Sequence, residues 1–411
     1  MSEMSYLEKL LDGVEVEWKT LGKVLKRTKG TKITAGQMKA LHKDNAPLKI
    51  FAGGKTVAFV DFKDIPEKDI NREPSIIVKS RGIIEFEYYD KPFSHKNEMW
   101  SYHSNNDAIS IKYIYYFLKI NEGYFQKIGG KMQMPQIATP DTDKFEVPIP
   151  CPDNPEKSLA IQSEIVRILD KFTALTAELT AELNMRKKQY NYYRDQLLSF
   201  DDEQEKPIYL EKLLDGVEVE WLPLGEVSAL RRGRVMSKGY LTENFGPYPV
   251  YSSQTANNGK IGSINTFDFD GEYISWTTDG ANAGTVFYRT GKFSITNVCG
   301  LITLKSKYPL IYKFLFYWLT IEAKKHVYSG MGNPKLMSHQ VENIPVPILC
   351  PDNPEKSLAI QSEIVRILDK FDTLTNSITE GLPREIELRQ KQYEYYRDLL
   401  FSFPKPETVS N

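Results

Sequence analysis

Three stretches of this amino-acid sequence each occur twice. Residues 151–172 spell CPDNPEKSLAIQSEIVRILDKF, and residues 350–371 repeat all 22 letters, 199 positions later. Two further pairs show the same duplication: YLEKLLDGVEVEW at 6–18 and 209–221, and RKKQYNYYRDQLLSF at 186–200, which returns with four substitutions at 389–403. Repeats this long predict two copies of one structural unit, joined by shared connecting elements.

Between the repeats lie two segments that do not resemble each other by eye, residues 19–150 (the first variable segment) and 222–349 (the second variable segment). Lys and Arg outnumber Asp and Glu by 22 to 15 in the first and by 13 to 8 in the second, giving +7 and +5. The entry segments are acidic, with −4 over residues 1–18 and −6 over residues 201–221. Positive charge concentrated on the variable segments favours a polyanionic partner such as DNA.

Length and composition indicate a globular class. The chain has 411 residues, 41% of them hydrophobic and 26% charged, which allows two or three domains with cores of their own. No apolar run reaches the roughly 18 residues of a membrane span, and the amino terminus lacks a signal-peptide pattern. We therefore expect a cytoplasmic protein with no membrane partner. Its three cysteines form no CxxC motif, and we expect them to be reduced thiols.

Both variable segments predict a mixed α and β fold. In the first, extended apolar runs at 56–60 and 75–78 precede a helical pattern over 109–120, where Tyr113 and Phe117 fall on one face. The second has short strand patterns followed by a helix near 310–322. Each segment closes on a glycine-rich stretch and a proline-flanked strand, so we expect one fold in both.

The repeated connectors predict long helices. Asn154 is placed to cap a helix that has Pro155 at its first position. Apolar residues then recur at alternating steps of four and three, the spacing of a coiled-coil seam, and in the second copy Gly381 and Pro383 should kink or restart the helix. We expect an antiparallel pair with one globular part at each end, an internal pseudo-two-fold repeat, and residues 6–18 beside the end of the second helix.

At this point a family resemblance is visible. The order of repeated and variable parts, together with CPDNPEKSLAIQSEIVRILDKF, KQYNYYRDQLLSF and NNGKIG, resembles the specificity subunit of type I restriction-modification enzymes. Residues 176–183 read TAELTAEL, which is similar to the tandem spacer of the type IC subfamily. The resemblance covers the whole chain.

The resemblance implies a non-catalytic subunit with five parts: a conserved segment at 1–18, a target recognition domain at 19–150, a central conserved region at 151–221, a second recognition domain at 222–349 and a conserved region at 350–411. Each recognition domain would bind one half of a bipartite, asymmetric site in double-stranded DNA. Two methyltransferase subunits with S-adenosylmethionine, and restriction subunits with ATP and Mg, would supply the chemistry. One extra TAEL copy would lengthen the helix by about 6 Å, or one to two base-pair steps.

Two other functions stay open at this stage, a self-contained DNA methyltransferase or nuclease and a coiled-coil adaptor for two protein ligands. The sequence lacks the NPPY-like or DPPY-like tetrapeptide expected of an adenine methyltransferase. A phosphate loop at GGKT would need glycine where Lys49 stands, and the five histidines have no ligand spacing. We therefore predict no catalytic residue, metal site or cofactor in this chain.

Polar and basic residues in loops of the variable segments are the candidate DNA contacts. Asn and Gln pair with adenine, Arg and Lys pair with guanine, and phosphate contacts fix the register. In the first variable segment we predict Lys91, His95, Lys96, Asn97, Lys131, Gln133 and Gln136. In the second we predict Ser252, Ser253, Gln254, Asn257, Asn258, Lys260, Asn282, Asn333 and Lys335, with Arg231, Arg232 and Arg234 at phosphates. The seam tyrosines 190, 193, 393 and 396 are expected to pack between helices.

Overall fold

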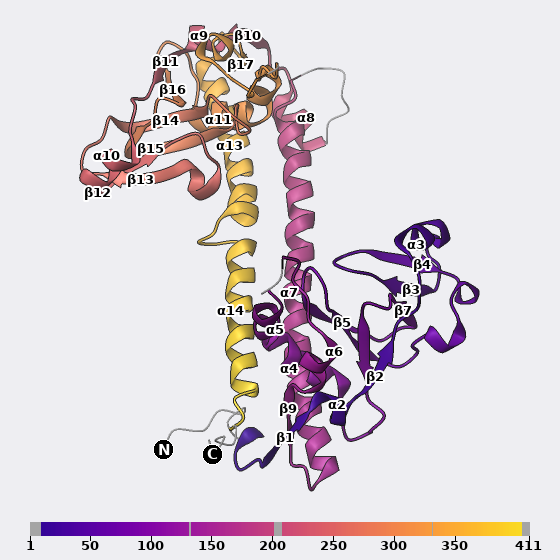
Figure 1. Cartoon of the computed structure of the whole chain (residues 1–411). Helices are drawn as coiled ribbons and strands as arrows, with labels where there is room; N and C mark the ends of the chain where they lie inside the picture. The colour runs from indigo at the N-terminus through magenta and orange to yellow at the C-terminus, as the bar shows by residue number, and fades with distance from the viewer. Residues whose placement is uncertain (1–9, 131–132, 201–207, 331, 405–411) are drawn as a thin grey trace. The chain divides into compact units, whose positions relative to one another are not determined.

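The computed structural model describes residues 10–130, 133–200, 208–330 and 332–404 (Figure 1). Contacts within the chain divide it into two units, Met1–Glu178 with Ile386–Asn411 (unit 1) and Leu179–Glu385 (unit 2). Each unit combines one variable segment with helical parts of the repeats, and each is of mixed α and β type, as predicted. The five segment boundaries given above stay a prediction.

In the described residues of unit 1 the strands form sheets with the orders β2-β8-β5-β6, β4-β3-β7 and β1-β9. The parallel pair β3 and β7 joins strands that are distant in the sequence. Its elements before the long helix are β1 (Val16–Thr20), α2 (Leu21–Val24), β2 (Lys26–Lys29), α3 (Ala35–Leu41), β3 (Leu48–Phe51), β4 (Val57–Val60), η1 (Phe62–Asp64), η2 (Glu67–Asp69), β5 (Ser75–Lys79), β6 (Glu85–Tyr89), β7 (Phe93–His95), β8 (Trp100–His103), α4 (Ile111–Ile120), α5 (Glu122–Gly129), α6 (Thr139–Asp143) and β9 (Glu146–Pro150).

Unit 2 repeats this order around one larger sheet, β11-β16-β14-β15-β12-β13, and a separate pair, β10-β17. Its corresponding elements are α8 (Ile208–Leu214), β10 (Val219–Pro223), α9 (Leu224–Val227), β11 (Ser228–Arg232), α10 (Lys238–Glu243), β12 (Phe245–Tyr251), η3 (Ala256–Gly259), β13 (Lys260–Ile264), β14 (Phe269–Thr277), β15 (Val286–Ile295), β16 (Cys299–Leu304), α11 (Tyr312–Glu322), η4 (Ala323–His326), α12 (Ser338–Val341) and β17 (Pro345–Leu349).

The two amphipathic helices lie where the sequence predicted them. In α4, the face that carries Tyr113 and Phe117 is buried in the core of unit 1. In α11, Leu315 and Trp318 are buried in the core of unit 2. Both helices present the same polar contact to a long helix: Lys112 and Tyr116 bind Asp170, and in unit 2 the side chains of Lys313 and Tyr317 bind Asp369 in the same way. The two variable segments therefore share one fold beneath unlike sequences.

The long helices begin at the predicted caps. The side chain of Asn154 accepts a hydrogen bond from the backbone of Lys157 at 3.0 Å, at the start of α7 (Pro155–Leu197). Asn353 does the same for Lys356, also at 3.0 Å, at the start of α13 (Pro354–Asn376). The predicted interruption of the second helix is confirmed, because α13 ends at residue 376 and α14 (Leu382–Leu400) starts after Gly381, whose φ is +82°.

Within each unit the two helical segments pack antiparallel. In unit 1 the ring of Phe172 lies 5.4 Å from that of Tyr396, and Leu169 shares a core with Leu400. In unit 2 the ring of Phe371 stacks on Tyr193 at 5.5 Å. The tyrosines thus pack between helices, as expected.

The described part of residues 6–18 also lies beside the end of the second helix, as predicted. The indole of Trp18 donates to the carbonyl of Pro404 at 3.0 Å. Tyr6 lies outside the described residues.

Candidate DNA interface

A pair of surface loops is built identically in the two units. In unit 1 the turn Ser80–Gly82 meets the loop 133–137: Gly82 N–H donates to Pro135 O at 2.8 Å and Ile137 N–H to Ser80 O at 2.9 Å. In unit 2 the turn Thr278–Gly280 meets the loop 332–336 through the same two bonds, Gly280 to Pro334 at 3.0 Å and Leu336 to Thr278 at 2.9 Å. We call this arrangement the loop pair.

The loop pair places two residues opposite each other in each unit. Arg81 and Gln136 form an antiparallel bridge in unit 1, and Asp279 and Lys335 form the same bridge in unit 2. The anchoring neighbours are buried, since Ser80 is 4% exposed and Thr278 is 0% exposed. Because side chains alternate along extended backbone, the bridged residues point to the other side, toward solvent.

A third segment approaches the turn that follows β7 in unit 1 and β15 in unit 2. Gly30 follows β2 and lies so near the next turn that a Cβ would stand 2.3 Å from the carbonyl oxygen of His95. Gly233 follows β11, and its Cβ would stand 2.1 Å from the carbonyl oxygen of Ile295. Real Cβ atoms do not approach so closely, so only glycine fits at either position.

The turn after His95 completes the cluster in unit 1. Ser80 donates its hydroxyl proton to the carbonyl of Glu98 at 2.7 Å, and Thr278 does the same to Val298 at 2.9 Å in unit 2. Each variable segment therefore gathers four separate chain segments at one place on its surface: the two of the loop pair, the segment after β2 or β11, and the turn after β7 or β15.

The predicted contacts of the first variable segment fall partly on this cluster. Asn97 lies exposed in the turn, and Lys96 beside it pairs with Glu98 at 2.6 Å. Gln133 is exposed on the loop pair, and Gln136 accepts two bonds from Arg81. Lys91 is exposed on a different turn, between β6 and β7. Lys131 lies outside the described residues.

His95 is a correction to the predicted surface. It is 0% exposed, and its ring nitrogens lie 3.1 Å from Lys96 O and 3.1 Å from Ser101 Oγ. Burial lowers the pKa of His95, so the neutral ring is favoured. Its placement in the strand interior does not support the predicted DNA contact, and the side chain supports the turn instead.

The predicted loop of the second variable segment also meets the loop pair. Ser253 donates to the carbonyl of Asp279 at 2.8 Å, and Ser252 shares a hydrogen bond with Thr296 at 2.9 Å. Gln254 closes the loop by donating to the carbonyl of Lys260 at 2.8 Å. These three side chains are engaged in hydrogen bonds that anchor the loop. The other predicted residues of the loop, Asn257, Asn258 and Lys260, are exposed and available to a ligand.

The remaining predicted residues of this segment lie at or near the same cluster. Asn333 and Lys335 are exposed on the loop pair, and Asn282 is half-buried in the turn after Gly280. Arg231 and Arg232 are exposed on β11. Arg234 is already engaged, with an ion pair to Asp268 at 3.0 Å and a bond to the hydroxyl of Tyr240 at 3.0 Å.

Sequence reasoning missed Arg81 and Asp279. Each precedes a glycine with positive φ, +77° at Gly82 and +85° at Gly280, directly after a buried strand. The shared pattern of a hydroxyl residue, a charged residue and glycine (Ser80-Arg81-Gly82 and Thr278-Asp279-Gly280) was the available signal.

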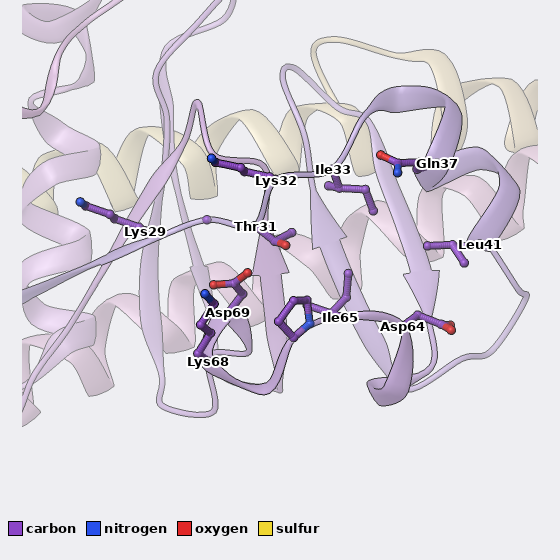
Figure 2. Close-up of a pocket in the computed structure, with 12 residues that line it drawn as sticks. Lys29, Thr31, Lys32, Ile33, Gln37, Leu41, Asp64, Ile65, Lys68 and Asp69 are labelled. Atoms are coloured by element: carbon purple, nitrogen blue, oxygen red, sulfur yellow. The ribbon is translucent and has the colours of Figure 1, made fainter.

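A cavity of about 560 Å³ lies next to the cluster in unit 1 (Figure 2). The segment after β2, helix α3 and the two 3-10 helices form its walls. Its charged lining is mixed, with Lys29, Lys32 and Lys68 against Asp64 and Asp69. The three lysines and two aspartates leave this lining with one excess positive charge.

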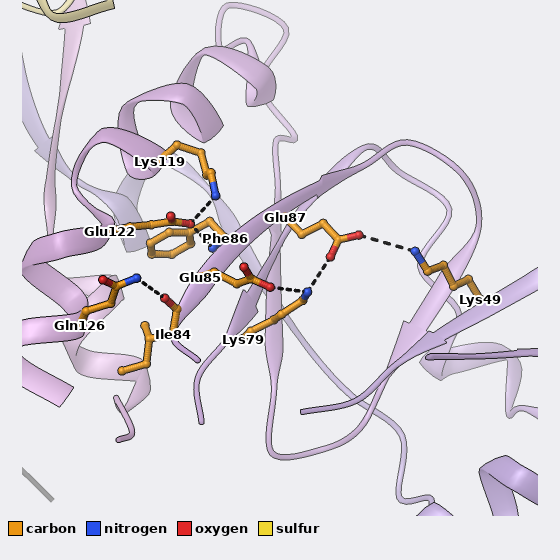
Figure 3. Close-up of polar contacts among 9 residues, drawn as sticks. All are labelled: Lys49, Lys79, Ile84, Glu85, Phe86, Glu87, Lys119, Glu122 and Gln126. Atoms are coloured by element: carbon orange, nitrogen blue, oxygen red, sulfur yellow. Dashed lines mark hydrogen bonds and ion pairs between the residues drawn. The ribbon is translucent and has the colours of Figure 1, made fainter. Parts of the chain in front are cut away.

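The two units surround a buried cationic side chain with different groups. In unit 1 Lys79, 6% exposed, pairs with Glu85 at 2.6 Å and Glu87 at 2.8 Å, and Glu87 also lies 3.6 Å from Lys49 (Figure 3). Burial lowers the pKa of Lys79, but its hydrogen bonds to the two carboxylates outweigh this effect and hold the pKa above its usual value. The first variable segment thus neutralises its buried charge.

In unit 2 the buried cation is Arg289, 3% exposed, which lies 3.6 Å over the ring of Tyr251. It donates to Ser275 Oγ at 3.0 Å, and its Nη1 has no hydrogen-bond partner among the described residues. Burial lowers the pKa of Arg289 to about 10. No carboxylate of the described chain pairs with it, so the aromatic face stabilises this charge.

Two further properties of the described residues concern metal ions and membranes. Those residues include no group of three or more His, Cys, Asp or Glu side chains placed to hold a metal ion. Among them, too, no helix combines the length and apolar character needed to cross a membrane.

Comparison with known proteins identifies the class. Residues 14–186 and 216–388 each match the family described as the type I restriction modification DNA specificity domain. The chain belongs to this family, with one matched copy in each half.

Full-length relatives agree. The chain is 41% identical over 440 residues to the Escherichia coli type I restriction enzyme EcoR124I/EcoR124II specificity subunit, covering 100% of both chains. It is 35% identical to the E. coli EcoprrI specificity subunit, covering 92% of this chain and 93% of the relative. The crystal structure of the type I restriction-modification S subunit from M. genitalium shares the fold, with a TM-score of 0.64, 18% identity and coverage of 98% and 100%.

Proposed function

We propose that this chain is the DNA specificity subunit of a type I restriction-modification complex, in which each variable segment recognises one half of a bipartite, asymmetric target. The observation that carries the proposal is the loop pair, because one backbone arrangement presents unlike side chains in the two units. Two such surfaces of the same architecture suit two half-sites of different sequence.

Charge supports DNA as the ligand. The variable segments carry +7 and +5, from 22 basic against 15 acidic and 13 basic against 8 acidic residues. Exposed lysines and arginines near the loop pair would contact phosphates and fix the register, while the bridged and loop residues face base edges. His95 is left out of the proposed set, and Arg234 contributes only if DNA displaces its contact with Asp268.

Catalysis belongs to partner subunits in this proposal. Two methyltransferase subunits would dock on the long helices and bring S-adenosylmethionine, and restriction subunits would bring ATP and Mg for cleavage. This chain would supply recognition and spacing, with no cofactor of its own. The proposed location of the complex is the cytoplasm.

The test uses the full chain co-purified with its methyltransferase partner. We expect a gel shift of duplexes that contain one bipartite site, and methylation of that site when S-adenosylmethionine is added. Exchange of residues 222–349 for the corresponding segment of a relative should change one half of the site and leave the other. The partner alone is the control.

Two results would overturn the proposal. A change in both half-sites after the exchange would show that recognition is not divided between the segments. Methyl transfer by this chain without a partner would show a self-contained methyltransferase instead.

A further inference from the structure

The loop pair offers equivalent positions for base discrimination. The backbone bonds from Gly82 to Pro135 and from Gly280 to Pro334 fix the two frames to the same geometry. Residues 81 and 136 in unit 1 therefore correspond to residues 279 and 335 in unit 2. An identical frame with different side chains is what separate base specificities require.

In unit 1 the bridged residues form an oriented set of donors. Arg81 is exposed, and its Nε and Nη2 donate to Oε1 of Gln136 at 3.2 Å and 3.0 Å. These two bonds fix the plane of the guanidinium, and among the described residues no ion pair of Arg81 is formed. An oriented guanidinium matches the two adjacent acceptors of guanine, O6 and N7, in the major groove.

In unit 2 the bridged residues place an acceptor beside a donor. The hydroxyl of Thr278 shares its one proton between the carbonyl of Val298, at 2.9 Å, and the carboxylate of Asp279, at 2.6 Å, and so orients that carboxylate. Lys335 is exposed opposite it, and the two form no ion pair with each other in the described structure. A carboxylate can accept a hydrogen bond from the amino group of cytosine, and an ammonium can donate one to O6 of guanine. The cytosine amino group and guanine O6 are neighbours in one base pair.

We propose that the residue pairs Arg81–Gln136 and Asp279–Lys335 determine one base position in each half-site, with Arg81 specifying a guanine and Asp279 with Lys335 specifying a cytosine–guanine pair. This inference rests on the proposed function. It adds the positions and base identities that the family assignment leaves open.

The experiment exchanges the pairs in the full chain bound to its methyltransferase partner. The variant R81D/Q136K gives unit 1 the side chains of unit 2, and D279R/K335Q does the reverse. Bound duplexes are selected from a library with randomised half-sites and sequenced. Each double variant should change the preferred base at one position of one half-site by about 10- to 100-fold, and leave the other half-site as in the wild type.

Two single variants separate base recognition from charge. Arg81→Lys keeps the positive charge but loses the planar fork, so preference for guanine should fall while overall binding is largely retained. Lys91→Ala removes an exposed lysine away from the loop pair and should weaken all sequences alike. Thermal unfolding of each variant checks that the fold is kept, which the exposure of Arg81 and Lys335 favours.

The outcomes distinguish the two proposals. If the wild-type complex selects no bipartite site, the proposed function fails. If the wild type selects a site but the exchanged pairs leave its consensus unchanged, the function stands and this inference is overturned. A change spread over several positions, or over both half-sites, would also overturn it.

Discussion

Among the described residues each unit buries one cationic side chain, at a different strand position and with different neighbours. Lys79 is neutralised by Glu85 and Glu87, whereas Arg289 has an aromatic ring and no carboxylate. In unit 2 the strand position that corresponds to Glu87 is Phe287, as the pairing of each with the neighbouring central strand shows. The carboxylate of Glu87, which pairs with Lys79 in unit 1, is therefore replaced by an aromatic ring in unit 2.

The ion pairs of Lys79 should make the stability of unit 1 depend on pH. The pKa of Lys79 is raised in the folded chain above its usual 10.5, so its stabilising contribution is complete below pH 10.5 and is lost as the pH rises through the folded pKa. Lys79→Met should cost about 1 to 2 kcal/mol at pH 8, because the two carboxylates left behind stay partly hydrated.

Urea unfolding at pH 8 and pH 11 measures this effect. The difference in free energy of unfolding between wild type and Lys79→Met should shrink at the higher pH. Lys55→Met, at an exposed lysine without an ion pair, is the matched control. A difference that grows with pH would contradict the assignment.

The glycines after β2 and β11 should be intolerant of a side chain. In Gly30→Ala the new Cβ would stand 2.3 Å from the carbonyl oxygen of His95, so the backbone must shift, at a cost of about 1 to 3 kcal/mol. The shift should also disturb the adjacent turn and reduce recognition of one half-site. Chemical denaturation and half-site binding measure the two effects.

Gly36→Ala is the control for this prediction. Gly36 lies in α3, and the nearest atom to its Cβ position is Thr34 Oγ1 at 4.0 Å. Alanine there should leave half-site binding unchanged and stabilise the helix by up to about 1 kcal/mol. Equal losses in both variants would show that close approach at Gly30 is not the cause.

At the scale of elements, each unit is completed by the carboxyl-terminal end of a helix that crosses from the other half of the sequence. Leu400, at the end of α14, is fully buried in unit 1, and Leu197, at the end of α7, is 1% exposed in unit 2. The two leucines occupy the same position of the repeated tail.

Truncating either leucine should destabilise one unit selectively. Leu400→Ala is expected to cost about 2 to 5 kcal/mol in unit 1, and Leu197→Ala the same in unit 2, because each leaves a cavity in a buried core. Hydrogen exchange followed by mass spectrometry should show faster exchange within residues 19–150 for the first variant and within 222–349 for the second. Equal effects of both variants on both segments would contradict this division.

The elements that sequence analysis predicted correctly depend on local signals. The caps at Asn154 and Asn353, the interruption at Gly381 and the buried face of α4 follow from residues within a few positions of each other. The loop pair could not be predicted in this way. It joins residues 82 and 135, and residues 280 and 334, through strand register, which single-sequence patterns do not specify.

The same reason explains why the burial of single residues at the candidate site could not be predicted. His95 is one polar residue in a loop-like stretch, and the pairing of β7 with β3, together with the bond from Thr31 N–H to its carbonyl at 2.8 Å, shows that it enters a strand and is buried. The local signal at Arg81 and Asp279 is confined to a preceding hydroxyl residue and a following glycine. Their equivalence becomes visible when the two units are compared bond by bond.

At the scale of the whole molecule, both units draw on the continuous helix α7, which has 43 residues and includes TAELTAEL at 176–183. An inserted third TAEL adds four residues, or about 6 Å of helix. We expect the unrecognised gap in the DNA target to lengthen by one or two base pairs, since one step is about 3.4 Å, while both half-sites keep their sequence. The measurement is selection of bound duplexes from a library with variable gap lengths.

An insertion at a second place provides the matched comparison. The same four residues placed after Ser377, in the non-helical break between α13 and α14, add chain without extending a continuous helix. This variant should keep the wild-type gap. If both insertions lengthen the gap equally, chain length and not helix length sets the spacing. If neither insertion lengthens the gap, the spacing is independent of α7, because four added helical residues act on the gap through the rise of 1.5 Å per residue.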